Sequence, residues 1–132
     1  MNRVYPAPFI SPLSERDLIL GEVGIERTAQ DAQWGEQNHS SGTGPTTPPL
    51  WRSRLNAAMT ARELAEQATS SCDSAADRGD LTWTDILLEE TFEALAENEG
   101  DNLREELIQV AAVAVAWIEC IDRRNIEREE SA

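Results

Sequence analysis

The chain has 132 residues, with 11 lysine or arginine residues against 25 aspartate or glutamate residues, and a net charge of −14. This length supports one domain with a modest core. A negative field of this size repels nucleic acids and anionic membrane surfaces, so we expect neither as a general partner. It also repels a free triphosphate, so a nucleotide site would need a divalent metal ion to reverse the local potential.

Residues 1–13 contain three prolines and predict an extended N-terminal arm. No apolar run of signal-peptide length occurs near the start, and the longest apolar run, 110–118, is too short to span a bilayer. We therefore expect a cytoplasmic protein without a membrane segment. Cys72 and Cys120 are the only cysteines and lack metal-ligand spacing, which predicts two reduced, buried or half-buried thiols.

The first helix is predicted from its start signal. Ser14 followed three residues later by Asp17 is typical of a capping box at a helix N-terminus. The helix should run to about Trp34, although Gly21 and Gly24 each cost roughly 1 kcal/mol relative to alanine.

A loop and a second helix follow. Segment 40–49 is rich in glycine, proline, serine and threonine, and it predicts either a plain connector or a mobile lid. Residues 50–78 have a helical pattern that stops at Gly79, and Asp80 or Thr82 should cap the helix after it. Arginines gather on the second helix, where they balance acidic neighbours or, alternatively, contact a phosphate: Arg52, Arg54 and Arg62.

The third helix has an apolar stripe and an acidic stripe. Leu88, Phe92 and Leu95 recur at i, i+4 and i+7, which predicts the core-facing side. The acidic residues fall on roughly the opposite face, which on its own indicates an ordinary solvated surface: Glu90, Glu93 and Glu97.

The fourth helix follows a break at 98–101 and is apolar at every residue from Val110 to Ile118. Such a helix is normally covered on nearly all sides. Glu106 and Gln109 then lie at the mouth of a buried surface, where a carboxylate needs a cation.

At these residues the sequence resembles a known family, the MazG-like all-α nucleoside triphosphate pyrophosphohydrolases, over roughly 15–40 and 82–124. The family signature is E-x-x-E, a gap, then E-x-x-D, on two antiparallel helices. Residues 90–93 match the first half and residues 106–109 occupy the second half. Gln109 departs from the pattern, because aspartate is expected there.

The resemblance implies Mg²⁺-dependent hydrolysis of a nucleoside triphosphate to a monophosphate and pyrophosphate. It implies Glu90, Glu93, Glu106 and Gln109 as ligands of Mg²⁺, with Mn²⁺ as the alternative ion. The amide of Gln109 would be the weakest ligand, because it offers only a neutral carbonyl oxygen. Glu89 or Glu90 would be the catalytic base that activates water.

Relatives often begin with a polar helix that ends in an aromatic residue beside the nucleotide pocket. The resemblance therefore implies Gln30, Trp34 and Asn38 as substrate-binding residues. An aromatic ring can stack on a base and amides can read its edges. The alternative is that Trp34 is a packing residue.

We predict an all-α fold of four main helices over 14–124, with the last two forming an antiparallel pair, and a charged tail over 125–132. The resemblance and the apolar fourth helix together imply a helical bundle completed by a homodimer or a dimer of dimers. Val113, Ala116 or Trp117 should lie near the interface. The competing functions are a nucleotide-binding protein that has lost catalysis and a non-enzymatic helical adaptor.

Overall fold

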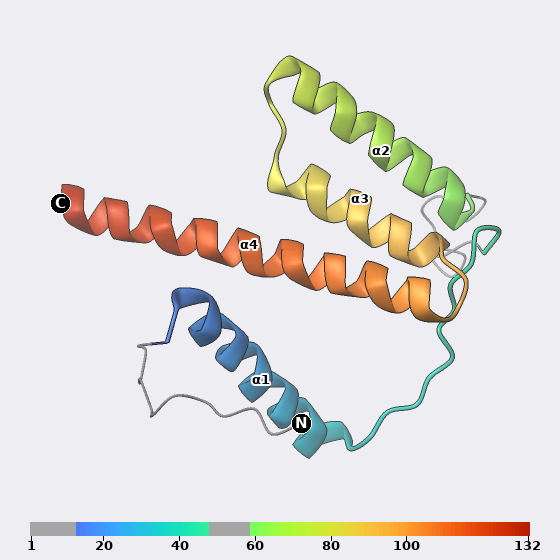
Figure 1. The fold of residues 1–132 in the computed structure, drawn as a ribbon, viewed down its shortest axis with the longest axis horizontal. Coiled ribbons are helices and arrows are strands. Elements are labelled where there is room, and N and C mark those ends of the chain that lie inside the picture. The colour runs from blue at the N-terminus through green and yellow to red at the C-terminus, as the bar shows by residue number, and fades with distance from the viewer. Residues whose placement is uncertain (1–12, 48–58) are drawn as a thin grey trace, which may run out of the picture. The chain divides into compact units, whose positions relative to one another are not determined.

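The computed structural model describes residues 13–47 and 59–132, which form helices and no strand (Figure 1). The predicted all-α class is confirmed for these residues. The elements are α1 (Glu15–Trp34), α2 (Ala61–Arg78), α3 (Trp83–Ala96) and α4 (Asp101–Ser131). The predicted arm, apart from Leu13, and residues 48–58 lie outside the described residues.

The chain divides into two compact units, residues 1–36 and 37–132, where we expected one domain. The first unit contains α1, whose predicted capping box is present. The Asp17 backbone N–H donates to Ser14 Oγ at 3.1 Å, and the Ser14 backbone N–H donates to Asp17 Oδ2 at 3.3 Å. Among the described residues of α1, Ile19 alone is buried.

The second unit holds α3 between α2 and α4 (Figure 1). Short connections at 79–82 and 97–100 reverse the chain, so α3 runs antiparallel to each neighbour. In the part of the chain that the structure describes, α2 and α4 do not pack on each other. The central helix therefore has two covered faces instead of one.

This central position corrects the predicted apolar stripe of α3. Leu88 is 44% exposed, and Phe92 and Leu95 are half-buried rather than core residues. Glu90 and Glu93, which periodicity alone assigned to a solvated face, are also half-buried. Periodicity fails here because α2 covers one side of α3 and α4 covers another.

The contact between α3 and α4 includes a pair of stacked indole rings. Trp83 and Trp117 have ring centroids 6.3 Å apart and planes inclined by 10°. Such a pair contributes about 0.5–1.5 kcal/mol beyond its buried area. The stack fixes the first turn of α3 against the middle of α4.

The fourth helix is longer and more exposed than the sequence predicted. It continues to Ser131, through most of the segment expected as a charged tail over 125–132. Ile118, the last residue of the apolar segment 110–118, is exposed. Leu107 and Ile108, just before this segment, are 52% and 54% exposed. A single helical neighbour cannot cover this helix on nearly all sides.

The helix ends in the second unit mostly follow the predicted signals. Gly79 ends α2 in the left-handed conformation at φ 75°, as predicted. Thr82, not Asp80, caps α3. The second helix begins at Ala61 with Thr60 as its N-cap, later than the predicted start near residue 50.

The loop before α2 is fastened to two helix ends. The Gly44 N–H donates to the Leu95 carbonyl at 3.0 Å, at the C-terminal end of α3. The N–H groups of Ala61 and Arg62 donate to the carbonyls of Thr47 and Pro45 at 2.8 and 3.2 Å. These bonds hold the N-terminal end of α2 beside the C-terminal end of α3, which favours the connector interpretation of this loop.

We expect Gly44→Ala to destabilise the fold by about 1–3 kcal/mol, the usual cost of a backbone conformation that only glycine adopts easily. Gly44 has φ +141°, and an added Cβ would lie 3.0 Å from Thr47 Oγ1. Gly100→Ala is the matched control, because Gly100 has φ +140° and open space around its Cα. Urea denaturation measures both variants. An equal loss in the two would show that the contact with Thr47 is unimportant.

Candidate metal centre

Three carboxylates from two helices meet between α3 and α4. Glu90 and Glu93 lie three residues apart on α3, a spacing that puts both on one side of a helix. Glu106 reaches them from the second turn of α4. One oxygen from each carboxylate lies within 4.8 Å of the other two, and all three residues are half-buried.

The cluster is electrostatically strained in the absence of a cation. Partial burial raises the pKa of Glu90, and the nearby charges of Glu106 and Glu89 raise it further. Burial also raises the pKa of Glu93, followed by the charges of Glu90, Glu89 and Glu106. Burial and like charge both disfavour the ionised form, so a divalent cation between these groups would relieve the repulsion.

The three side chains fit one hard divalent ion. Mg²⁺ binds oxygen ligands at 2.0–2.1 Å, so oxygens on opposite sides of one ion are about 4.2 Å apart. The carboxylate oxygens of the cluster lie within 4.8 Å of one another, so small side-chain rotations bring them into range. Three carboxylates leave coordination positions for water and for phosphate oxygens.

Gln109 lies one turn after Glu106 on α4 and is exposed. The spacing of three residues puts it on the same side of the helix as Glu106. Its amide adds no charge to the cluster.

Glu89 is half-buried on α3, and its charge acts on the Cys72 thiol of α2 as well as on the cluster. Burial raises the pKa of this thiol, followed by the charges of Glu89, Asp85 and Asp73, so Cys72 stays protonated. Cys72 is a buried free thiol and Cys120 is a half-buried one, as the sequence predicted.

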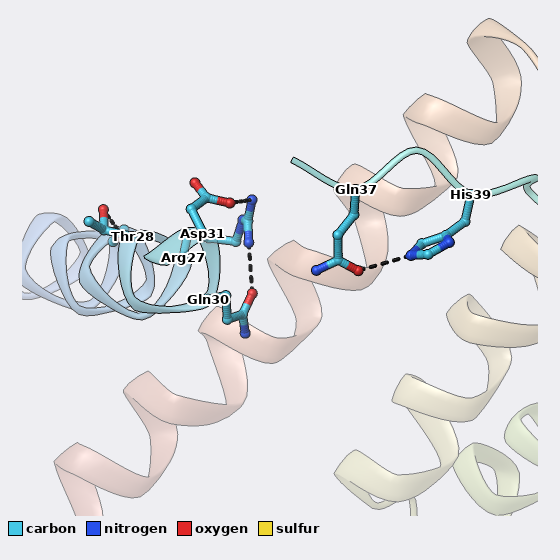
Figure 2. Close-up of polar contacts among 7 residues, drawn as sticks. Arg27, Thr28, Gln30, Asp31, Gln37 and His39 are labelled. Atoms are coloured by element: carbon cyan, nitrogen blue, oxygen red, sulfur yellow. Dashed lines mark hydrogen bonds and ion pairs between the residues drawn. The ribbon is translucent and has the colours of Figure 1, made fainter. Parts of the chain in front are cut away.

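The predicted base-binding residues belong to two units. Gln30 and Trp34 lie on α1 in the first unit, and Trp34 is 64% exposed. Figure 2 shows Gln30 accepting a hydrogen bond from Arg27 at 2.8 Å, while Asp31 pairs with the same arginine at 2.8 Å. The side chain of Arg27 therefore already engages the amide of Gln30.

Asn38 is the second residue of the second unit and lies in an exposed segment before the loop. Next to it His39 Nε2 lies 2.9 Å from Gln37 Oε1, a contact between two exposed side chains (Figure 2). The role of Gln30, Trp34 and Asn38 in substrate binding stays a prediction.

A polar groove that sequence reasoning missed runs beside the acidic cluster. It lies between α2 and α3 and has a volume of about 500 Å³. Glu93 lines it from α3, so the groove and the cluster share this residue. The residues of α2 that line it recur at helical spacing: Arg62, Ala65, Glu66, Thr69, Ser70, Asp73, Ser74 and Asp77. This polar stripe was visible in the sequence, but the pairing of α2 with α3 was not.

No family model, curated protein or solved structure matches this chain. Among the described residues, no helix is long and apolar enough to cross a membrane.

Proposed function

We propose that this protein is a nucleoside triphosphate pyrophosphohydrolase that requires Mg²⁺. The observation that carries the proposal is the convergence of Glu90, Glu93 and Glu106 from two helices. The resemblance to MazG-like enzymes names these same positions as metal ligands. The three carboxylates thus follow the expected spacing along the chain, and their oxygens lie close enough together to share one ion.

The proposed reaction needs ligands for the metal ion and a base for the attacking water. When bound, Mg²⁺ neutralises phosphate charge and polarises the phosphorus that water attacks. Glu90, Glu93 and Glu106 hold the ion, and Gln109 can contribute a carbonyl oxygen. Glu89 or Glu90 accepts the proton of the attacking water.

A nucleotide-binding protein without catalysis is the second candidate, and Gln109 is the observation that favours it. A non-enzymatic helical adaptor is the third, because half-exposed acidic residues also occur on ordinary surfaces. The two nucleotide functions predict stabilisation by metal and nucleotide, whereas the adaptor predicts none.

A turnover assay with eight ribo- and deoxyribonucleoside triphosphates separates the candidates. We expect release of pyrophosphate and a nucleoside monophosphate in the presence of Mg²⁺ or Mn²⁺, and none with EDTA. Isothermal titration with a non-hydrolysable analogue supplies the binding arm. Binding without turnover would indicate the second candidate. If the protein neither binds nor hydrolyses nucleotides and Mg²⁺ does not shift its melting temperature, the helical adaptor is the remaining candidate.

We also propose that the enzyme is a homodimer or a dimer of dimers, formed through the outer face of α4. This face consists of exposed apolar residues of α4 that its neighbour α3 leaves uncovered: Leu107, Ile108, Ala111, Ala112 and Ile118. Trp117, one of the residues first expected at the interface, instead stacks on Trp83 within the chain. A second copy would cover the outer face, and burying apolar surface favours association.

We expect light scattering to give at least twice the monomer mass of 14.6 kDa at micromolar concentration. Ile118→Glu should shift the protein to a monomer, because it places a charge within the outer face of α4. Ile126→Glu is the control, since Ile126 is exposed eight residues further along, near the helix end. A monomeric wild-type protein would rule out this assembly.

A further inference from the structure

The groove between α2 and α3 has chemistry that the metal cluster does not use. Its α2 wall has one cation, Arg62, at its beginning and carboxylates and hydroxyls further along. The volume of about 500 Å³ lies within the range of small-molecule sites, roughly 300–1,000 Å³. Glu93 connects the groove directly to the cluster.

The two ends of the groove differ in charge. The N-terminal end of α2 lies beside the C-terminal end of α3, because the loop residues Gly44 and Pro45 bridge Leu95 and Arg62. Arg62 therefore lies at the end of the groove where Glu93 and Ala96 contribute from α3. A phosphate chain bound at the metal cluster would reach this guanidinium, which suits phosphate oxygens.

The other end of the groove has groups that bind hydroxyls. Asp73 is eleven residues beyond Arg62, which corresponds to roughly 16 Å along a helix. Thr69 and Ser70 lie four and three residues before Asp73, so their hydroxyls are its neighbours on the helix surface. A carboxylate beside two hydroxyls can accept hydrogen bonds from the 2′- and 3′-hydroxyls of a ribose.

We propose that this groove binds the sugar end of the substrate, with Asp73 as the residue that selects ribonucleoside over deoxyribonucleoside triphosphates and Arg62 as a phosphate ligand. The inference rests on the proposed pyrophosphohydrolase function. Arg62 and Asp73 lie at opposite ends of the α2 wall of one groove, roughly 16 Å apart along the helix, so the phosphates and the sugar of an extended nucleotide can engage different ends. The substrate then meets the acidic end of the groove with its hydroxyl donors, not with its phosphates.

The test compares kcat/KM for each ribonucleotide and its deoxy counterpart at saturating Mg²⁺. Wild type should prefer the ribonucleotide by about tenfold, at the lower end of what a hydrogen bond to a charged group contributes. Asp73→Asn should lower kcat/KM for the ribonucleotide and leave the deoxynucleotide unchanged, so the preference disappears. Ser70→Ala should reduce the preference partly. Arg62→Gln should lower both values together by about tenfold, because both substrates carry the same phosphates.

Asp122→Asn is the control, since it removes the same charge from an exposed position on α4. Asp73 is also exposed, so Asp73→Asn should keep the fold, which circular dichroism checks. An active enzyme without ribose preference would overturn this inference and leave the pyrophosphohydrolase proposal standing. The same holds if Asp73→Asn lowers kcat/KM equally for the ribonucleotide and the deoxynucleotide. A protein that neither binds nor hydrolyses any nucleotide would overturn both.

Discussion

Glu93→Gln should abolish the stabilisation of this protein by Mg²⁺ while raising the melting temperature of the metal-free protein. In wild type, a bound ion stabilises the fold by RT ln(1 + [Mg²⁺]/Kd), which is about 2.7 kcal/mol at one hundred times Kd. The variant loses one of three carboxylates and therefore most of this gain. Turnover should fall at least about 100-fold, because even partners outside the coordination shell typically affect metal sites by 10- to 100-fold.

The rise in metal-free stability follows from the pKa of Glu93. Burial and the charges of Glu90, Glu89 and Glu106 raise this pKa above its value in the unfolded chain. A carboxyl group of this kind contributes stability below its unfolded pKa, and this contribution is lost as the pH rises through its folded pKa. At neutral pH the ionised group therefore opposes folding. The advantage of Glu93→Gln should be absent near pH 4 and reach its full size by pH 7.

Differential scanning fluorimetry across pH, with and without Mg²⁺, measures both effects. Glu105→Gln is the matched control, because Glu105 is exposed beside Glu106 on α4 and is not one of the clustered carboxylates. The free energy of unfolding of Glu105→Gln should differ from that of wild type by less than about 0.5 kcal/mol, as is usual at surface positions. An identical response to Mg²⁺ in wild type and Glu93→Gln would mean that the carboxylates are only solvated.

The fold was predictable wherever the signal was local. The capping box of Ser14 and Asp17 and the stop at Gly79 depend on residues within one turn, and both were read correctly from the sequence. The environment of α3 was not, because it depends on which helices lie on each side. Leu88 follows the apolar period yet is 44% exposed, because it lines an open pocket between α2 and α3 instead of a closed core.

The acidic cluster was predictable only in part, because part of it depends on residues of one helix and part on the pairing of two helices. Glu90 and Glu93 share a face by spacing alone, but Glu106 joins them only through the reversal of the chain at 97–100. The family pattern supplied that pairing, and the periodicity of either helix could not. The influence of the Glu89 charge on the pKa of Cys72 had no sequence signal, because it depends on the packing of α2 against α3.

Gln109→Asp should lower the Mg²⁺ concentration that gives half of the maximal rate by roughly tenfold, which corresponds to about 1.4 kcal/mol of binding free energy. Gln109 is exposed one turn after Glu106, so the substitution needs no repacking. The new carboxylate adds a full charge beside Glu106 and a stronger ligand for a hard cation than an amide carbonyl. If the proposed function holds, the wild-type protein should therefore have a high Mg²⁺ requirement, with Mn²⁺ as an effective substitute.

The metal-free protein should respond in the opposite direction, because a fourth carboxylate increases repulsion within the cluster. Like charges at this helical spacing cost about 0.2–0.5 kcal/mol, so the metal-free melting temperature of Gln109→Asp should fall slightly. Gln109→Ala is the control that removes the carbonyl oxygen without adding charge. It should raise the Mg²⁺ requirement above that of wild type if the amide is a ligand.

The two responses of Gln109→Asp distinguish the nucleotide functions. In one outcome, the wild type turns over nucleotides at high Mg²⁺ concentration while Gln109→Asp is active at a lower concentration. This result fits an enzyme in which the phosphates of the substrate complete the coordination shell of the metal ion. A wild type that binds nucleotides but stays inert, while Gln109→Asp gains turnover, fits a binding protein that lost catalysis through this one residue. If neither protein binds nor hydrolyses any nucleotide, the cluster of Glu90, Glu93 and Glu106 has no catalytic role, since every ligand that the family pattern requires would then be in place.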